Sequence, residues 1–300
     1  MESMSTSNTR KPFDFNKILV TFLLFSCPVF NTFAKPDIKW AKYQLPPVFI
    51  NQGEFRNKGM GDAIFSFLQT RLSNYSHTDY LSVGVRIMRD FKLKPLVCSA
   101  MTSKKGREDF MIFSHPVTVL PSHNLHFSAK NPKLQFILEE SRINGVISFE
   151  RLLASSANLI IGLNIHRSFG DKLNDILKLY IQQVQNLDET TSTADLLYMI
   201  DSQRIDLTIE LPFISYFVSR SANITVPIAI EPLAEASKFV KAYIACSNNA
   251  AGNLVINKIN QIIIEERSSR EYQQLFENWI PPQSRPSFRA GFKRHVIEAL

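Results

Sequence analysis

The sequence has little cysteine, tryptophan and glycine, with three, two and ten of these residues in 300. It also lacks internal repeats, low-complexity tracts and long runs of like charge. Without such tracts or runs, the sequence gives no sign of a disordered tail. The remaining composition, 45% apolar and 20% charged, is typical of a globular protein, and the length suffices for one large or two modest domains.

Sequence signatures of catalysis and of metal binding are missing as well. No cysteines or histidines stand at the spacing of zinc ligands, and there is no Gly-x-Ser-x-Gly elbow, His-Glu-x-x-His motif or P-loop. The histidines that could transfer protons, none with a visible partner in the sequence, are His115, His123, His126 and His166. We therefore expect a protein that is not an enzyme and that holds neither a cofactor nor a metal.

The chain carries a formal net charge of +7 at pH 7. Its basic residues are spread along the sequence and do not form the basic patch with interleaved aromatic residues that nucleic-acid-binding proteins use. A diffuse positive charge favours attraction of small anions or of an anionic surface. We expect a monomer without a nucleic-acid partner.

The N-terminal segment has the pattern of a secretory signal peptide. Basic residues precede an apolar run over 18–30, and small residues follow up to Ala34. We therefore expect a signal peptide over 1–34 and export to the periplasm. The run is shorter than the about 20 apolar residues of a membrane span, although an uncleaved anchor stays open as an alternative. A second alternative is a lipid anchor at Cys27, because Leu24-Phe25-Ser26-Cys27 loosely resembles a lipobox.

Hydrophobic patterns predict two α/β units after the signal peptide. The elements of the first unit are a strand from 37 that leaves its sheet at Pro46-Pro47, a helix capped by Asp62, a strand over 80–87, a helix over 88–93 and a strand over 94–99. Those of the second unit are a strand over 159–163, a helix capped by Ser168, a helix over 194–202 and a strand over 205–209.

The last part of the chain, a strand over 239–245 followed by helices over 253–266 and 270–279, has no further strand to pair with. It would pack on the first unit, so that the last part of the chain belongs to the same lobe as the first part. We therefore expect two lobes, the second inserted into the first, with two crossing strands near 116–120 and 236–242 as a hinge. Residues 35–118 and 240–300 would form the first lobe, and 119–239 the second.

Several motifs occur in the order found in one known family. Arg107 stands six residues before the Phe113 of a Phe-Ser-x-Pro motif. Supporting motifs are Pro46-Pro47 before a glycine loop, Gly59-x-Gly61-Asp62, Gln203-Arg204-Ile205-Asp206 and Tyr272-x-x-x-Phe276-x-x-Trp279. With these motifs the mature chain resembles extracellular solute-binding protein family 3, the polar-amino-acid-binding type, with a type II periplasmic-binding fold.

The resemblance implies that Arg107 holds the carboxylate of a ligand, through the planar fork of donors of its guanidinium. Thr102 stands where the family supplies a hydroxyl or backbone donor. Ser168 precedes a predicted helix whose N-terminus would favour an anionic group. The alternatives are a surface ion pair for Arg107 and an ordinary helix cap for Ser168.

Three departures from the family pattern concern the ligand, and one is Lys104, which stands where the family has a Thr or Ser three residues before the Arg. The family has an aromatic residue where Leu45 stands here, for which Trp40 or Tyr43 could substitute. The Asp that binds a ligand ammonium is replaced by Leu211, and the neighbouring Glu210 could take that role only if the strand end is shifted. We therefore expect an amino acid or an organic acid as ligand, with a carboxylate and no obligatory ammonium.

The resemblance also implies that Cys98 and Cys246 lie on neighbouring strands. Two cysteines in an oxidising compartment are more often bridged than free, so we expect a disulfide between them, with two separate buried thiols as the alternative.

The implied function is capture of a small solute for uptake by a membrane permease. The alternatives are a sensory or envelope-assembly protein on the same fold, and an enzyme derived from it.

Overall fold

The computed structural model describes residues 35–102, 106–155, 158–164, 167–188, 191–221 and 227–299. From Lys35 onward the chain forms one compact unit. The expected signal peptide, Cys27 and His166 lie outside the described residues. Within the described part, no helix is both long and apolar enough to cross a membrane.

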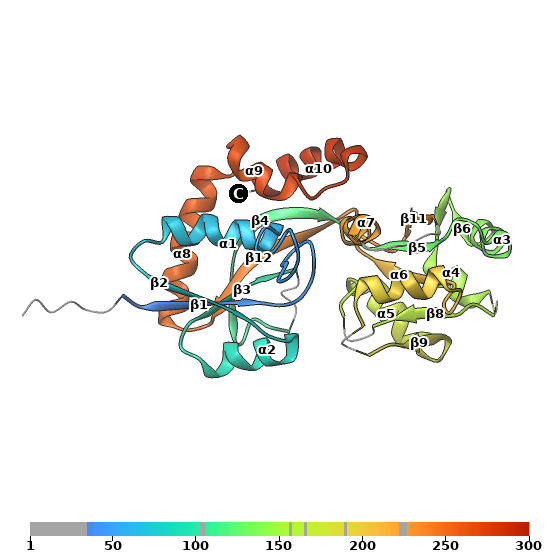
Figure 1. The fold of residues 1–300 in the computed structure, drawn as a ribbon, viewed down its shortest axis with the longest axis horizontal. Coiled ribbons are helices and arrows are strands. Elements are labelled where there is room, and N and C mark those ends of the chain that lie inside the picture. The colour runs from blue at the N-terminus through green and yellow to red at the C-terminus, as the bar shows by residue number, and fades with distance from the viewer. Residues whose placement is uncertain are drawn as a thin grey trace, which may run out of the picture. The chain divides into compact units, whose positions relative to one another are not determined.

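The first lobe is built on a five-stranded sheet (Figure 1). In spatial order its strands are β2 (Ser76–Leu81), β1 (Asp37–Lys42), β3 (Val97–Met101), β12 (Phe239–Ser247) and β4 (Met111–Pro121). β1 pairs in parallel with β2 and β3, whereas β12 runs antiparallel to β3 and β4. The last strand of the lobe therefore lies between strands that come much earlier in the chain.

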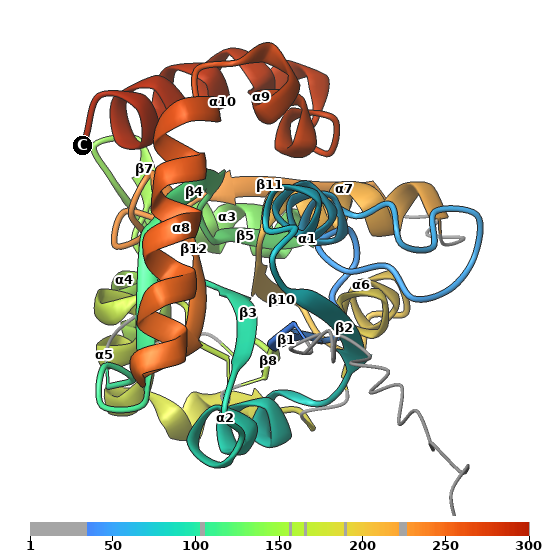
Figure 2. The same cartoon turned by 90° about the vertical axis from the view of Figure 1, so that its left-hand side faces the viewer.

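Helices cover the first sheet, and Figure 2 shows α8 lying along the β4 and β12 side of it. The helices of this lobe are α1 (Met60–Arg71), α2 (Gly84–Leu93), α8 (Ala250–Glu266), α9 (Arg270–Glu277) and α10 (Arg285–Phe292), with short turns at Pro282–Ser284 and Lys293–Ile297. Trp40, Phe65 and Tyr272 are fully buried in the main core.

The second lobe has its own five-stranded sheet and its own core. Its strands in spatial order are β11 (Ile228–Pro232), β5 (Asn124–Ser128), β10 (Leu207–Glu210), β8 (Ile161–Leu163) and β9 (Val184–Asn186). The remaining elements are α3 (Pro132–Glu140), the hairpin β6 (Arg142–Ile143) and β7 (Val146–Ile147), α4 (Phe149–Ala154), α5 (Asp171–Leu179), a turn at Ile181–Gln183, α6 (Thr193–Asp201) and α7 (Pro212–Ser221).

Two neighbouring strands of the first sheet join the lobes (Figure 1). β4 leaves the first sheet at Pro121, and β12 re-enters it at Phe239, the residue paired with Pro121. The 11 residues of β4 and the 9 of β12 run antiparallel up to this point. The expected α/β fold with two sheets is therefore confirmed, and on this topology we propose the division into 35–118 with 240–300, and 119–239.

Three local expectations were wrong. Asp62 is not the N-cap residue of α1: the helix begins at Met60 after Gly59, and Asp62 is its third residue, whose carboxylate accepts a hydrogen bond from the Gly59 N–H at 3.1 Å. Ile87 lies in α2 and not in a strand, since it packs with Phe91, four residues on, on the buried side of that helix. Ser168 is not a cap either: α5 begins at Asp171, after Gly170 with a φ of 99°, which favours glycine.

Candidate ligand-binding site

Tyr43 directly follows β1, where the chain leaves the first sheet. Its ring meets the Phe49 ring edge-on at 5.2 Å, and its hydroxyl lies 3.5 Å from the carbonyl oxygen of Ala100 at the end of β3. The loop that carries Phe49 is fastened by Asp62, which accepts hydrogen bonds from the Ile50 and Gly59 N–H groups, both at 3.1 Å. This packing gives the Tyr43 ring one defined position at the end of the strand.

In the second lobe, Glu210 ends β10 and is fully buried. The Arg167 guanidinium donates two hydrogen bonds to its carboxylate, at 2.7 and 3.0 Å. The Thr193 hydroxyl donates a third at 2.5 Å and the Leu211 N–H a fourth at 2.8 Å. A carboxylate has about four acceptor positions, so every one of them is used within the protein.

Tyr43 of the first lobe interacts electrostatically with Arg167 of this ion pair and with Arg107 of its own lobe. Burial raises the pKa of the Tyr43 hydroxyl to about 12, while the positive charges of Arg167 and Arg107 oppose that rise. Burial also acts to raise the pKa of the Glu210 carboxyl, but Arg167 and the other donors outweigh it and hold the pKa below its ordinary value. We call Tyr43, Arg107, Arg167 and Glu210 the interlobe cluster; its formal charges sum to one excess positive charge.

Arg107 is half-buried, and Thr102, on the other side of an undescribed segment, is exposed. The Arg107 guanidinium lies 3.6 Å from the sulfur of Met101, and its backbone N–H donates to the Glu108 carboxylate at 2.9 Å. Because Met101 is the last residue of β3, the guanidinium lies at the same edge of the first sheet as Tyr43.

Three of the expected ligand contacts make other interactions in the structure. Trp40 is fully buried, its indole N–H donates to His77 Nδ1 at 3.1 Å, and its ring packs on Phe65 at 4.7 Å, so it lies in the core and cannot touch a solute. Glu210 cannot bind a ligand ammonium, because its acceptor positions are filled. Ser168 is exposed and accepts a hydrogen bond from the Asn174 amide at 3.2 Å.

The sequence argument missed Arg167 and Thr193 as members of the site. Arg167 directly precedes Ser168, and Thr193 opens α6, but neither position indicated a partner 43 or 17 residues away. A buried carboxylate requires a charged or hydrogen-bonding partner. The sequence shows Glu210 but not its burial, so it gave no reason to look for such a partner.

Two histidines lie beside the interlobe cluster. His123 contacts the Phe169 ring at 5.4 Å, and His126 on β5 is fully buried and pairs its Nδ1 with the carbonyl oxygen of Asn124 at 3.0 Å. Neither His123 Nδ1 nor His126 Nε2 has a hydrogen-bond partner among the described residues. Burial lowers the pKa of both imidazoles to about 4, so both are neutral at pH 7 and add no charge to the cluster.

The depressed pKa of His126 predicts acid sensitivity. In the unfolded chain this histidine takes up a proton near pH 6.5, whereas in the folded protein it does so only near pH 4. The unfolded state therefore binds more protons between these values, and stability falls as the pH drops from 6.5 towards 4. We expect His126→Gln to reduce the loss of unfolding free energy between pH 7 and pH 5 by about 2 kcal/mol.

Urea unfolding of both proteins at the two pH values measures this difference directly. His77→Gln would be a poor control because His77 bonds to Trp40, and His295→Gln would be one because the pKa of His295 is also lowered, so the exposed Lys172→Gln serves instead. An unchanged pH dependence in His126→Gln would show that this imidazole is not kept neutral in the folded protein.

No family model matches the sequence, and no curated protein matches it either. Solved structures do match. A periplasmic binding protein of high arginine specificity from Salmonella typhimurium is 13% identical, with a TM-score of 0.56 over 82% of this chain and 100% of that one. An arginine 3rd transport system periplasmic binding protein from Legionella pneumophila is 15% identical, with a TM-score of 0.56 and the same coverage.

A double mutant of the VFT2 domain of BvgS from Bordetella pertussis is 16% identical, with a TM-score of 0.56 over 82% of this chain and 94% of that domain. The chain has the type II periplasmic-binding fold. The two sheets and the pair of crossing strands agree with the two lobes and the hinge that the hydrophobic patterns predicted. Identities of 13–16% show the fold and leave the ligand to be argued from the site.

Proposed function

We propose that this protein is a periplasmic solute-binding protein that captures a small carboxylate-bearing solute for uptake by a membrane transporter. The observation that carries the proposal is the interlobe cluster, in which Tyr43 of one lobe hydrogen-bonds at the sheet edge where Arg107 lies and interacts electrostatically with Arg107 and with Arg167 of the other lobe. A solute bound there would contact both lobes at once, and closing two lobes around a ligand is the expected motion of such a hinge.

The charges of the cluster favour an anion. Arg107 and Arg167 are positive, Glu210 is the single negative member, and the nearby histidines are neutral at pH 7. An arginine binds a carboxylate through parallel hydrogen bonds and does so best in a partly buried place, as at Arg107. The proteins of similar fold include arginine-binding ones, but Glu210 is saturated here, so we propose a ligand whose recognition does not require an ammonium group.

No catalytic role is part of this proposal. The cluster contains no serine, cysteine or lysine nucleophile with an activating base, and the buried histidines bond to no reactive side chain among the described residues. Binding and release of the solute are therefore the proposed activity.

A thermal-shift screen of the purified protein against amino acids, dicarboxylic acids, aromatic acids and sugars tests the proposal. A ligand that binds only the folded state adds about 2.7 kcal/mol of stability at one hundred times its dissociation constant. We expect a carboxylate to raise the Tm of the wild type, and the rise to vanish in Arg107→Ala. Arg86→Ala, an exposed arginine on α2, is the matched control and keeps the shift.

Two results would contradict the proposal. A shift from a neutral sugar alone would show that the cluster does not select anions. No shift across the whole panel would favour the sensory or envelope-assembly alternative, in which the partner is a protein.

A further inference from the structure

Three aromatic rings from three separate segments meet between the lobes. Phe55 lies in the loop between β1 and α1 of the first lobe, Trp279 stands two residues after α9 of the same lobe, and Phe217 lies on α7 of the second. The centre of the Phe217 ring is 6.3 Å from that of Phe55 and 5.7 Å from that of Trp279, and the Phe55 and Trp279 rings are 5.9 Å apart. All three pairs meet edge-on, a geometry in which aromatic rings attract one another. We call these three residues the aromatic latch.

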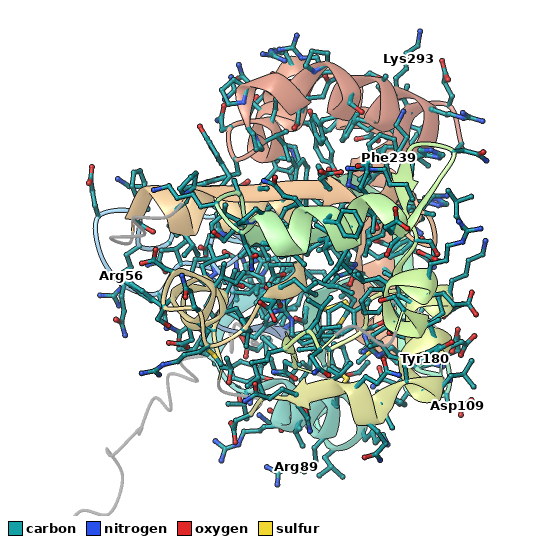
Figure 3. The ribbon with its side chains drawn as sticks, turned by 90° about the vertical axis from the view of Figure 1, so that its right-hand side faces the viewer. Arg56, Arg89, Asp109, Tyr180, Phe239 and Lys293 are labelled. Carbon is teal, nitrogen blue, oxygen red and sulfur yellow. A yellow bond between two sulfur atoms is a disulfide. The ribbon has the colours of Figure 1, made fainter. Side chains whose placement is uncertain are left out.

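The loop that carries Phe55 presents this ring in a polar setting. Phe55 is the single large apolar residue over 51–59. Gly53 and Asn57, with φ values of 75° and 57°, turn the chain on either side of it, and the Arg56 N–H donates to the carbonyl oxygen of Gly53 at 3.1 Å. Figure 3 shows the Arg56 side chain at the outer edge of the molecule. The turn therefore holds one aromatic ring out from the first lobe, and that ring meets Phe217 of the second.

The latch is joined to the interlobe cluster through the chain itself. α7, which carries Phe217, begins at Pro212, two residues after Glu210. Leu211 stands between them, is buried in the main core, and donates its N–H to the Glu210 carboxylate at 2.8 Å. A movement of α7 away from the first lobe therefore also displaces the end of β10 and the ion pair that Glu210 forms there.

The exposure of the latch is that of a contact that can open. Phe55 has an exposed fraction of 44%, and Phe217 and Trp279 are half-buried. Tyr272 of α9, by contrast, is fully buried in the main core. Apolar stabilisation is roughly proportional to the area removed from water, so separating three rings that are already partly exposed costs much less than opening the core.

We propose that the aromatic latch keeps the two lobes docked in the absence of a solute. The protein then rests in the arrangement in which Tyr43, Arg107 and Arg167 lie near one another. The apparent affinity for a solute rises with the fraction of molecules that already have the binding arrangement, so the latch strengthens capture. This consequence for capture rests on the proposed function, whereas the docking of the lobes does not.

The distance between two nitroxide labels, measured by pulsed electron paramagnetic resonance without added solute, tests the latch. The labels are attached at Arg89→Cys on α2 of the first lobe and Lys178→Cys on α5 of the second, both exposed positions. Cys27→Ser is introduced in every protein, since the other two cysteines form the disulfide. We expect one narrow distance when the latch is intact and a second, longer distance when it is removed.

Single substitutions remove the ring from either side of the latch. Phe55→Ala is expected to lower the ratio of docked to separated molecules about threefold, and Phe217→Ala, which loses both ring pairs between the lobes, about tenfold. Phe136→Ala, an exposed phenylalanine on α3, is the matched control and leaves the single distance. Thermal unfolding shows that each variant is folded, and Phe55 lies in an exposed loop, so its removal leaves the packing of α7 on α6 in place.

The double variant Phe55→Ala/Phe217→Ala distinguishes a latch from two unrelated packing effects. Because the two rings contact each other, we expect the loss in the double variant to stay near the about tenfold of Phe217→Ala. The proposal is overturned if both single variants keep the single distance, if the two losses multiply to about thirtyfold, or if the lobes are already separated with the latch intact. No solute is present, so these outcomes are independent of whether the interlobe cluster binds a carboxylate, which the thermal-shift screen decides.

Discussion

Replacing both cysteines with alanine should lower the free energy of unfolding by about 2–5 kcal/mol. The disulfide joins Cys98 of β3 to Cys246 of β12, as the resemblance implied, and closes a loop with a sequence separation of 148 residues. Everything in the second lobe lies within this loop. In the unfolded chain the bridge restricts a long segment, and the restriction raises the free energy of the unfolded state.

The position of the bridge makes it a structural one. Both cysteines are fully buried in the main core, and they are paired across the antiparallel strands β3 and β12. β12 carries the chain back from the second lobe, so the bridge fastens the returning strand to the first sheet. Loss of the bridge should therefore destabilise the attachment of β12 to β3, and β12 is one of the two strands that join the lobes.

Urea unfolding of the wild type and of Cys98→Ala/Cys246→Ala, each with and without dithiothreitol, measures this effect. We expect the wild type under reducing conditions to approach the variant, and the variant to be indifferent to the reductant. The slope of the unfolding free energy against urea concentration should also be larger without the bridge, because the unfolded chain is then more expanded and exposes more surface. Equal midpoints for oxidised wild type and variant would show that the bridge adds nothing to stability.

Arg167→Ala is expected to lower the free energy of unfolding by about 3–5 kcal/mol, because it leaves a buried carboxylate without its charged partner. Glu210 has an exposed fraction of 0%, and two of its four donors come from Arg167. Thr193 and Leu211 can stabilise the negative charge only through dipoles. The variant should therefore unfold earlier in urea at pH 7, and its Glu210 pKa should rise.

The double variant Arg167→Met/Glu210→Leu is the matched control. It removes both charges together, and a buried ion pair replaced by apolar residues of similar size often leaves stability nearly unchanged or raises it. We expect it to be within about 2 kcal/mol of the wild type, with the greater loss in Arg167→Ala. Equal losses in both variants would show that packing, and not an unpaired charge, explains the effect.

The pH dependence of Arg167→Ala follows from the lowered pKa of Glu210. A carboxyl whose folded pKa lies below its unfolded value of about 4.3 stabilises the protein fully above that value, and the stabilisation is lost as the pH falls through the folded pKa. The stability difference between wild type and Arg167→Ala should therefore be largest near neutral pH and shrink in acid. A difference that grows below pH 4 would contradict this assignment.

Much of the element order followed from the sequence. Alternating residues in β1, the apolar face of α8 and the late return strand β12 were visible because side-chain periodicity reports which face is buried. The boundaries moved by a few residues, and the elements without a predicted counterpart are β5, α3, β6, β7, α4, β9, α7, β11 and α10. α7 has a proline at its start and buries residues in the main core shared with the first lobe, so its position depends on packing across lobes that the local pattern does not reveal.

For the candidate site, too, some features could be predicted from the sequence and others only from the tertiary structure. The sequence by itself predicted the two-lobed α/β fold, and the family resemblance implied the pairing of Cys98 with Cys246 and singled out Arg107 and Tyr43. These depend on periodicity and on short motifs, which are local properties. The tertiary structure alone decided that Trp40 is core, that Glu210 is saturated by Arg167, and that Phe217 meets aromatic rings of the first lobe, because burial and contact partners depend on residues far apart in the chain.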